Sequence, residues 1–342
     1  MQVRHIDNDG AHAWNEYVAS RPESSFYHRY EWREFYAGYF DKETEYLAAI
    51  DSDGELRGVL PLVRLKSWLF GDFFVSLPFV NYGGVVADND QISDDLLAAA
   101  ASLGAERGVS HLELRHANVD FDMPCRTDKV AMCLELPKSI ESLGKSIGSK
   151  RRSQIRRPLR ENPEIRFGTV DLLDCFYDVF SRNMRDLGTP VYAKSMFRFL
   201  LDTFPENTMV VTIRVDDAPA AAAFLIFDNI RMEIPWASTV QTFNRISINM
   251  LLYWEVLKYS IEAGKTTFDF GRSTVDSGTY RFKKQWGAEP VPLHWHYWLA
   301  GGGGLPKLNP DNPKYRMAIR MWQNLPLSVA NFLGPHIVRH LP

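Results

Sequence analysis

Residues 267–298 constrain the fold most, because a buried-strand pattern, a glycine turn and an aromatic-basic helix follow one another directly. Phe268 and Phe270 alternate with polar neighbours, as residues of a strand do. Gly271 then allows a sharp turn whose backbone can approach a ligand closely. A second polar turn leads into a short basic helix that ends at Gly287. This stretch therefore predicts a strand, a turn and a helix start that form a functional site.

Length and composition indicate a two-domain globular protein. The chain has 342 residues, of which 45% are hydrophobic and 24% charged, and this length exceeds the usual single-domain size. A net charge of −3 gives no general attraction for polyanions, so a contact with nucleic acid or anionic lipid would need a local patch. The three cysteines, Cys125, Cys133 and Cys175, form no CxxC pair, which favours a reducing compartment.

The sequence shows no targeting or membrane-spanning segment. Residues 1–10 are charged and have no apolar core of the signal-peptide type. The longest apolar run, residues 218–227, is much shorter than the roughly 20 residues of a spanning helix. We therefore expect a cytoplasmic protein whose membrane contact, if it has one, is peripheral and on the inner face.

The two halves of the chain predict the same order of elements. In each half, helices precede antiparallel strands, and a capped helix and one more strand follow. The first half has helices at 11–20, 30–39 and 92–108 and strands at 46–50, 56–65, 73–77 and 111–115. The second half has helices at 172–187, 194–203 and 246–263 and strands at 209–215, 220–227, 230–237 and 267–270. This order predicts an α+β duplication without a repeat in the sequence itself.

A helical tail follows the glycine-rich residues 301–304, which read as a flexible linker. Tyr315, Ile319 and Trp322 stand at helical spacing, so we expect the tail to pack on the first domain. Pro326 and Pro335 would interrupt its apolar face, which argues against a membrane contact.

Several motifs resemble those of the FemAB-related proteins linked to PEP-CTERM/exosortase gene clusters. They are the DFGRS strand end at 269–273, the Tyr-x-Phe-Lys segment at 280–283, the Trp-Gly pair at 286–287, and the segments 77–84 and 185–190. The resemblance runs over most of the chain. It implies an α+β fold of two tandem GNAT-like domains, at 1–144 and 145–300, with residues 301–342 as linker and helical tail.

The resemblance also implies an N-acyltransferase. The Fem group transfers amino acids from aminoacyl-tRNA to peptidoglycan precursors, whereas related branches are assigned as acyl-CoA-dependent. Acyl-CoA and aminoacyl-tRNA therefore both stand as the co-substrate of this chain. No tightly bound cofactor is expected, and the acceptor would be an amine of a cell-envelope or exopolysaccharide precursor.

Residues of the 267–298 stretch are the expected catalytic and acceptor-binding groups. Lys283 matches the lysine of the Fem motif, which is thought to face donor phosphate or the developing charge, and Phe282 would wall the channel. Asp269 could orient or deprotonate the amine, or serve only a structural hydrogen bond. Arg272 and Ser273 would hold an acceptor anion or the carbonyl oxygen, with Tyr280 beside them.

Two further segments are candidates for substrate contact. The turn formed by Asn81, Tyr82, Gly83 and Gly84 could present exposed amides and a stacking ring, or be a plain glycine turn. Arg185 and Tyr192 offer a cation and a phenol beside a helix end, where arginine suits a phosphate or carboxylate. A structural arginine on a helix surface is the alternative.

The loop before the helix at 246–263 is the place where simple GNAT enzymes hold the donor pyrophosphate on free N–H groups. Here this loop lacks glycine, so close approach to a pyrophosphate is in doubt. Arg245, Ser247 and Asn249 could still contact the donor, or the loop could be an ordinary helix cap.

Residues 145–160 hold seven cations and no acid. Arg152, Arg156 and Arg160 are spaced by four and would share a helix face, although Pro158 should end that helix. The run is either a solvated interdomain linker or a phosphate contact for tRNA, a nucleotide-linked acceptor or membrane lipid.

We expect no metal site. His294 and His296 share one side of a strand, but no further His or Cys cluster stands near them in the sequence, so a paired strand is favoured. GxSxG, HExxH, P-loop and GxGxxG motifs are also missing. The rival functional class is a catalytically idle GNAT-like module that binds a glycan precursor or a protein of a surface-assembly system.

Overall fold

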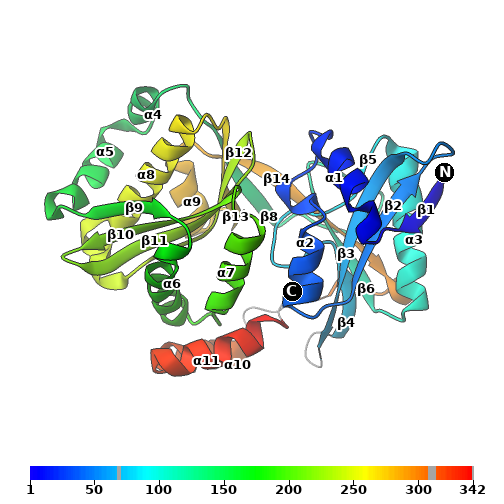
Figure 1. Cartoon of the computed structure of the whole chain (residues 1–342). Coiled ribbons are helices and arrows are strands. Elements are labelled where there is room, and N and C mark those ends of the chain that lie inside the picture. The colour runs from blue at the N-terminus through cyan, green and yellow to red at the C-terminus, as the bar shows by residue number, and fades with distance from the viewer. Residues whose placement is uncertain (68–70, 307–312, 341–342) are drawn as a thin grey trace. The chain divides into compact units, whose positions relative to one another are not determined.

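A computed structural model describes residues 1–67, 71–306 and 313–340, and Figure 1 labels its elements. The chain forms two units, and each is assembled from separate parts of the sequence. Unit 1 contains Met1–Val130, Val291–Leu308 and His340–Pro342. Unit 2 contains Ala131–Pro290 and Asn309–Arg339.

The sheet of unit 1 has the order β1-β2-β3-β4-β6-β14. Its strands are β1 (Gln2–His5), β2 (Thr44–Ile50), β3 (Leu56–Ser67), β4 (Gly71–Val75), β6 (His111–Ala117) and β14 (Glu289–Leu299). The short strands β5 (Val86–Ala87) and β7 (Cys125–Arg126) pair with β3 and β14. All described pairs are antiparallel except β4 with β6, which are parallel.

Helices on both faces of this sheet follow from its alternating side chains. Leu47 and Ala49 of β2 pack in one cluster with residues of α3 (Asp90–Glu106). Tyr46 and Ala48, one residue out of phase, pack in the other cluster with α1 (Ala11–Ala19). The helix expected at 30–39 is a short α2 (Trp32–Glu34) that continues as a π-helical turn, Phe35–Tyr39.

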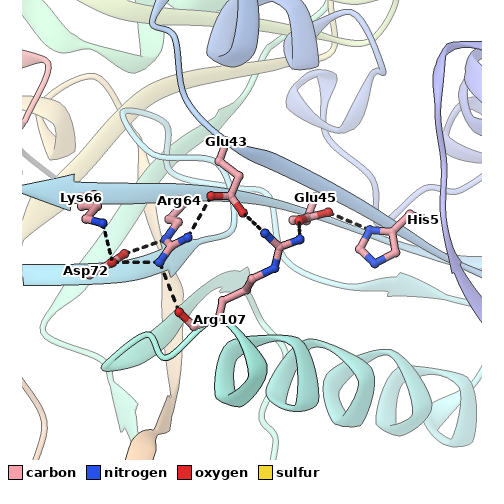
Figure 2. A network of polar contacts seen from close by, with 7 residues as sticks. All are labelled: His5, Glu43, Glu45, Arg64, Lys66, Asp72 and Arg107. Atoms are coloured by element: carbon pink, nitrogen blue, oxygen red, sulfur yellow. Dashed lines mark hydrogen bonds and ion pairs between the residues drawn. The ribbon is translucent and has the colours of Figure 1, made fainter.

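Unit 1 also contains a network of ion pairs between strands (Figure 2). Arg64 of β3 contacts Asp72 of β4 at 2.7 Å and Glu43 at 2.9 Å. Arg107, which ends α3, contacts Glu43 and Glu45 at 2.8 and 3.0 Å. Because the Glu43 carboxylate is shared by the Arg64 and Arg107 guanidinium groups, the network fixes α3 to the strands that it covers.

The sheet of unit 2 has the order β8-β13-β12-β11-β10-β9. Its strands are β8 (Lys129–Glu135), β9 (Glu164–Gly168), β10 (Thr208–Val215), β11 (Ala218–Phe227), β12 (Arg231–Thr239) and β13 (Thr267–Thr274). Strands β9 to β12 are antiparallel neighbours, whereas β12 and β13 are parallel.

Helices cover both faces of this sheet as well (Figure 1). α6 (Leu173–Leu187) and α7 (Lys194–Thr203) pack on one face and α8 (Ile248–Glu262) on the other, where it also contacts α5 (Gly148–Arg156). The remaining helices of unit 2 are α4 (Ile140–Ser146), α9 (Gly278–Lys284), α10 (Pro313–Gln323) and α11 (Leu327–Val338).

The two units repeat one topology, as the order of elements predicts. Three antiparallel strands lead into a helix and then into a strand parallel to the third one: β2-β3-β4-α3-β6 in unit 1 and β10-β11-β12-α8-β13 in unit 2. The expected boundaries after residues 144 and 300 differ from those of the structure. Most of β8 belongs to unit 2, and most of β14 belongs to unit 1.

The helical tail belongs to unit 2, so the expectation that it packs on the first domain is wrong. Both α10 and α11 contact α6, and Gln323 donates a hydrogen bond to the Asp186 carbonyl at 3.0 Å. Gly334 lets α11 lie close to Val191, because a Cβ there would be 2.7 Å from the Val191 nitrogen. The Tyr315 side chain lies outside the described residues.

The two prolines of the tail do not interrupt α11. Pro326 precedes the first residue of the helix, where proline is well tolerated, and Pro335 lies within it. Among the described residues, no helix is both long enough and apolar enough to cross a bilayer.

Candidate active site

The candidate site lies in unit 2, where two parallel strands stop pairing. β12 and β13 pair from Arg231 with Thr267 to Glu233 with Asp269. Both strands continue beyond this last pair, and their backbone groups there need other partners. Glu233 and Asp269 are both buried, so two carboxyl groups lie at the point of divergence.

Lys283 of α9 supplies a partner for the β13 backbone. Its Nζ donates hydrogen bonds of 2.9 Å to the carbonyls of Gly271 and Arg272. Its side chain is only 7% exposed. Burial lowers its pKa to about 8, while the charges of Asp269 and Glu233 oppose that shift. Below that pH the site holds a buried ammonium with one N–H beyond the two that bind carbonyls.

Asp269 holds the turn that presents those carbonyls. Its Oδ1 accepts a 2.7 Å hydrogen bond from the Gly271 amide. Gly271 has a φ of 75°, a left-handed conformation that glycine adopts without steric cost. The sequence left two roles open for Asp269, and the hydrogen bond to Gly271 supports the structural one.

Phe282 lies in an aromatic cluster that holds α9 on α8 and β13. Its ring centroid is 5.0 Å from that of Tyr253 and 6.5 Å from that of Trp286. Tyr253 also stacks on Phe270 at 5.7 Å. Burial raises the pKa of Tyr253 to about 12, so its hydroxyl stays neutral. The described contacts give Phe282 an anchoring role for the helix that carries Lys283.

The other residues expected near Lys283 differ in accessibility. Arg272 is exposed, and Tyr280 is half-buried with the Lys284 ammonium 5.7 Å from its ring centroid. Ser273 is buried, and its Oγ has no hydrogen-bond partner among the described residues. An exposed cation and an unsatisfied buried hydroxyl thus follow each other at the end of β13.

Helix α6 and the loop after it approach the half of β12 that lies beyond its pairing with β13. Tyr192 lies edge-on to Trp236 of β12 at 6.1 Å between ring centroids, and Asn183 donates a 3.1 Å hydrogen bond to Ser238. Arg185, in contrast, pairs with its neighbour Asp186 at 2.7 Å. The structure therefore brings Tyr192 to this strand, while Arg185 makes the local ion pair of a helix surface.

The loop before α8 forms a 3-10 turn, Gln241–Ile246, although it lacks glycine. Ser247 takes the left-handed conformation, with a φ of 64°, and precedes the first residue of α8 without a side-chain cap. Arg245 is exposed and Asn249 half-buried. A glycine-like turn and an uncapped helix amino end are thus present.

The basic run belongs to unit 2, so the interpretation as an interdomain linker is wrong. It forms α5 and adjoining turns, and α5 ends at Arg156 before Pro158, as predicted. Arg152 donates a 2.7 Å hydrogen bond to the Gly144 carbonyl, which joins α5 to α4. Arg156 and Arg160 are exposed.

The turn at residues 81–84 belongs to unit 1, and the expectation of exposed amides there is wrong. The amides of Gly83 and Gly84 both donate to the Arg115 carbonyl, at 3.2 and 2.9 Å, and Tyr82 is buried. Asn81 is half-buried. These glycines serve close packing, since a Cβ on Gly84 would lie 2.1 Å from the His116 ring.

Three residues around Lys283 were not predicted from the sequence as part of the site: Glu233, Cys133 and Tyr253. The charge of Glu233 acts on the Lys283 ammonium, Cys133 lies within electrostatic range of it, and Tyr253 packs against Phe282 of the same helix. A carboxylate between the apolar residues Met232 and Ile234 was a usable signal for Glu233. Nothing local marks Cys133 or Tyr253, which reach the site only through the pairing of β8 and the packing of α8.

Comparison with known proteins agrees with this geometry. Residues 149–284 match the family model described as an acetyltransferase (GNAT) domain. That range contains β9 to β13, α8 and the whole of α9. The chain thus carries a GNAT domain, and the domain includes Lys283. No curated protein matches the chain.

Several solved structures are similar over most of the chain. FemX has a TM-score of 0.67 at 15% identity, covering 86% of this chain and 97% of that one. A tandem GNAT protein from the clavulanic acid pathway has a TM-score of 0.53 at 10% identity, with coverages of 89% and 100%. L-PGS from Bacillus licheniformis has a TM-score of 0.54 at 12% identity, with coverages of 94% and 99%.

These similarities confirm the predicted fold class: an α+β chain of tandem GNAT type with a helical tail. At such low identities, similarity to the solved structures shows the fold alone. The GNAT domain supports an acyltransferase in general.

Proposed function

We propose that the protein is an N-acyltransferase whose reaction takes place in unit 2, where β12 and β13 diverge. The observation that carries the proposal is the buried Lys283 ammonium, held on two β13 carbonyls beside two buried carboxyl groups. A buried cation is costly unless its partners or its task retain it. A GNAT domain that includes this lysine supports the choice of reaction.

In this reaction the lone pair of an acceptor amine attacks the carbonyl carbon of an activated acyl ester or thioester. The new C–N bond forms, the C–O or C–S bond breaks, and the amine proton leaves with the alcohol or thiol. Negative charge develops on the carbonyl oxygen meanwhile, and a preorganised donor in a buried site stabilises it most effectively. We assign this role to the third N–H of Lys283, and the positioning of its helix to Phe282.

Residues at the ends of both strands, β12 and β13, would then contact substrate. Arg272 and Ser273 at the end of β13 are assigned to an acceptor anion or the carbonyl, with Tyr280 beside them. Tyr192 lies on the β12 side. Arg245, Ser247 and Asn249 at the amino end of α8 are assigned to the donor phosphates, because uncapped N–H groups bind anions.

The acceptor that we propose is an amine of a cell-envelope or exopolysaccharide precursor, and the donor is acyl-CoA or aminoacyl-tRNA. The motif resemblance to the Fem group supports aminoacyl transfer, and the GNAT domain supports acyl-CoA. A thermal-shift panel of acyl-CoAs and charged tRNAs would identify the donor. Stabilisation by one class that Arg245→Ala removes supports the assignment, whereas no stabilisation by either class contradicts it.

The alternative is a catalytically idle GNAT-like module that binds a precursor or protein partner. The donor loop without glycine favours it. Such a module would bind acceptor but transfer nothing, and it would have no use for the costly buried ammonium of Lys283. Mass spectrometry of the acceptor after incubation with the stabilising donor separates the two functions.

We further propose that α11 lies on the membrane surface from which such precursors are taken. Its residues Ala330, Gly334 and Val338 are buried, and most of its larger apolar residues point outward. Phe332 is 70% exposed, and Val329, Leu333 and Ile337 are exposed on the same face. This arrangement reverses the usual one, in which the large apolar residues are buried.

The positive charge of the tail indicates that this face of α11 binds an anionic bilayer. Residues 313–342 contain four Lys or Arg and no Asp or Glu. Three of these cations lie in α10, and Arg339 directly follows α11. Apolar side chains with cations next to them are the features of an interfacial segment on acidic lipid.

Vesicle sedimentation tests this surface. The protein should bind phosphatidylglycerol vesicles more than phosphatidylcholine vesicles, and Phe332→Ser with Ile337→Ser should abolish binding. Ile230→Ser is a matched control, because Ile230 is 63% exposed but lies outside the tail. Equal binding by both variants, or a dimer that only the tail variant dissociates, would contradict the membrane assignment.

A further inference from the structure

The strand β14 carries a group of metal-ligating side chains in unit 1, whereas the site around Lys283 belongs to unit 2. His294 and His296 are two residues apart on this strand, so they share one face. Cys125 of β7 pairs directly with His296, which places its thiol on the same face. The loop between β6 and β7 adds Asp120.

The ligand atoms of these four residues all lie within 4.8 Å of one another. The Asp120 Oδ1 atom is 3.4 Å from the His296 Nε2 and 3.7 Å from the His294 Nδ1. Atoms that bind one tetrahedral ion at 2.0 to 2.3 Å are roughly 3.3 to 3.8 Å apart. Two of the separations therefore already match such an ion. No Cys stands near the histidine pair in the sequence, and the pairing of β7 with β14 brings Cys125 to it.

A second observation also indicates a ligand. The Nδ1 atom of His294 is buried and has no hydrogen-bond partner among the described residues. An imidazole nitrogen in this situation loses its hydration without compensation. A cation among the four groups would give this atom a bond.

Behind the ligands, His116 is placed to orient His296. The two Nδ1 atoms are 3.2 Å apart, and the Nε2 atom of His116 is 2.9 Å from the Val85 amide. Metal-binding histidines are commonly held through their second nitrogen in this way. Metal binding at His296 Nε2 would replace the Phe121 amide, which lies 3.1 Å from that atom.

We propose that Asp120, Cys125, His294 and His296 bind one Zn²⁺ ion. Two imidazoles, a thiolate and a carboxylate form a donor set that suits zinc and disfavours magnesium or calcium. Four protein ligands leave no open position, so the ion is structural. It links the loop after β6 and the strand β7 to β14, a strand that the chain supplies only after completing most of unit 2.

The test is the metal content and metal-dependent stability of the full-length protein. Protein purified without chelators should contain about one zinc per chain by elemental analysis. Removal of zinc should lower the melting temperature, and Zn²⁺ but not Mg²⁺ should restore it. Co²⁺ added to the metal-free protein should produce the thiolate-to-cobalt absorption band and the intense visible bands of a tetrahedral ion.

Variants separate the proposed site from incidental binding. Cys125→Ser should lose the thiolate-to-cobalt band, and His294→Gln should weaken zinc affinity at least tenfold. Cys175→Ser, which changes another free, partly buried cysteine, should behave as wild type. Should Cys125→Ser fail to fold, the titrations of wild type and His294→Gln decide. Wild-type protein without zinc, cobalt bands or a zinc-dependent melting temperature would overturn the proposal.

Discussion

A lysine buried beside two carboxyl groups changes the stability of the molecule with pH in a defined direction. The pKa of Lys283 falls from 10.5 to about 8 on folding, chiefly through burial. Between these values the unfolded chain binds more protons than the folded one, so stability must rise with pH there. Below pH 8 the full cost of the buried ammonium is present.

We predict that Lys283→Met removes this pH dependence. Over pH 8 to 10 the wild type should gain up to about 1.4 kcal/mol per pH unit relative to the variant, because one proton is linked to unfolding. Urea unfolding of both proteins at several pH values measures this difference. Parallel curves would mean that Lys283 titrates normally in the folded protein.

A second prediction for a single residue concerns Gly271. A side chain at its φ of 75° is strained, so Gly271→Ala should destabilise the protein by roughly 1–2 kcal/mol. It should also disturb the two carbonyls that hold Lys283. Gly278→Ala is the control, because Gly278 has open space around it and begins a helix. Equal denaturation midpoints for both variants would show that the Gly271 conformation is not required.

At the scale of elements, the basic helix α5 and its following turn offer phosphate contacts without a structural role for their outer cations. Arg156, Arg157 and Arg160 are exposed, whereas Arg152 joins α5 to α4. Replacing the three exposed arginines by Gln should weaken binding of charged tRNA or nucleotide-linked ligand and flatten its salt dependence. Unchanged affinity in a filter-binding salt titration would exclude such contacts. Melting temperature should stay within a few degrees.

Most elements were predictable from local pattern, and their partners were not. The helix at 194–203 agrees with the observed α7 at both ends, because its apolar spacing and flanking residues are local signals. The carboxyl group of Asp269 and the ammonium of Lys283 were also recognisable from their motif. The tail was assigned to the wrong unit, because helical spacing says that a face is buried but not against what.

At the scale of the whole molecule, each unit is built from segments that are separated in the sequence. Residues 291–308 belong to unit 1, although unit 2 separates them from the rest of it in the sequence. The strand at 293–298 was predictable, but its pairing with β6 depends on contacts more than 170 residues apart. The same long-range pairing brings Cys125 to His296, which explains why no local pattern revealed that group.

Truncation tests this sharing. A chain that ends at residue 290 lacks β14 and with it the buried Leu293, His296 and Tyr297, so unit 1 should not fold stably. A chain that ends at Gly304 keeps β14 and lacks only the tail, so it should fold with a lowered melting temperature. Circular dichroism and solubility compare the two. Equal stability would show that β14 is dispensable for unit 1.

In the reaction that we propose, Lys283 stabilises the negative charge that develops during acyl transfer. Its neighbour Lys284 provides a matched control, because it is exposed and belongs to the same helix. With the donor found in the thermal-shift panel, we predict that Lys283→Ala lowers kcat/KM by about 10²-fold or more while Lys284→Ala stays near wild type. Full activity in a correctly folded Lys283→Ala protein would contradict the claim.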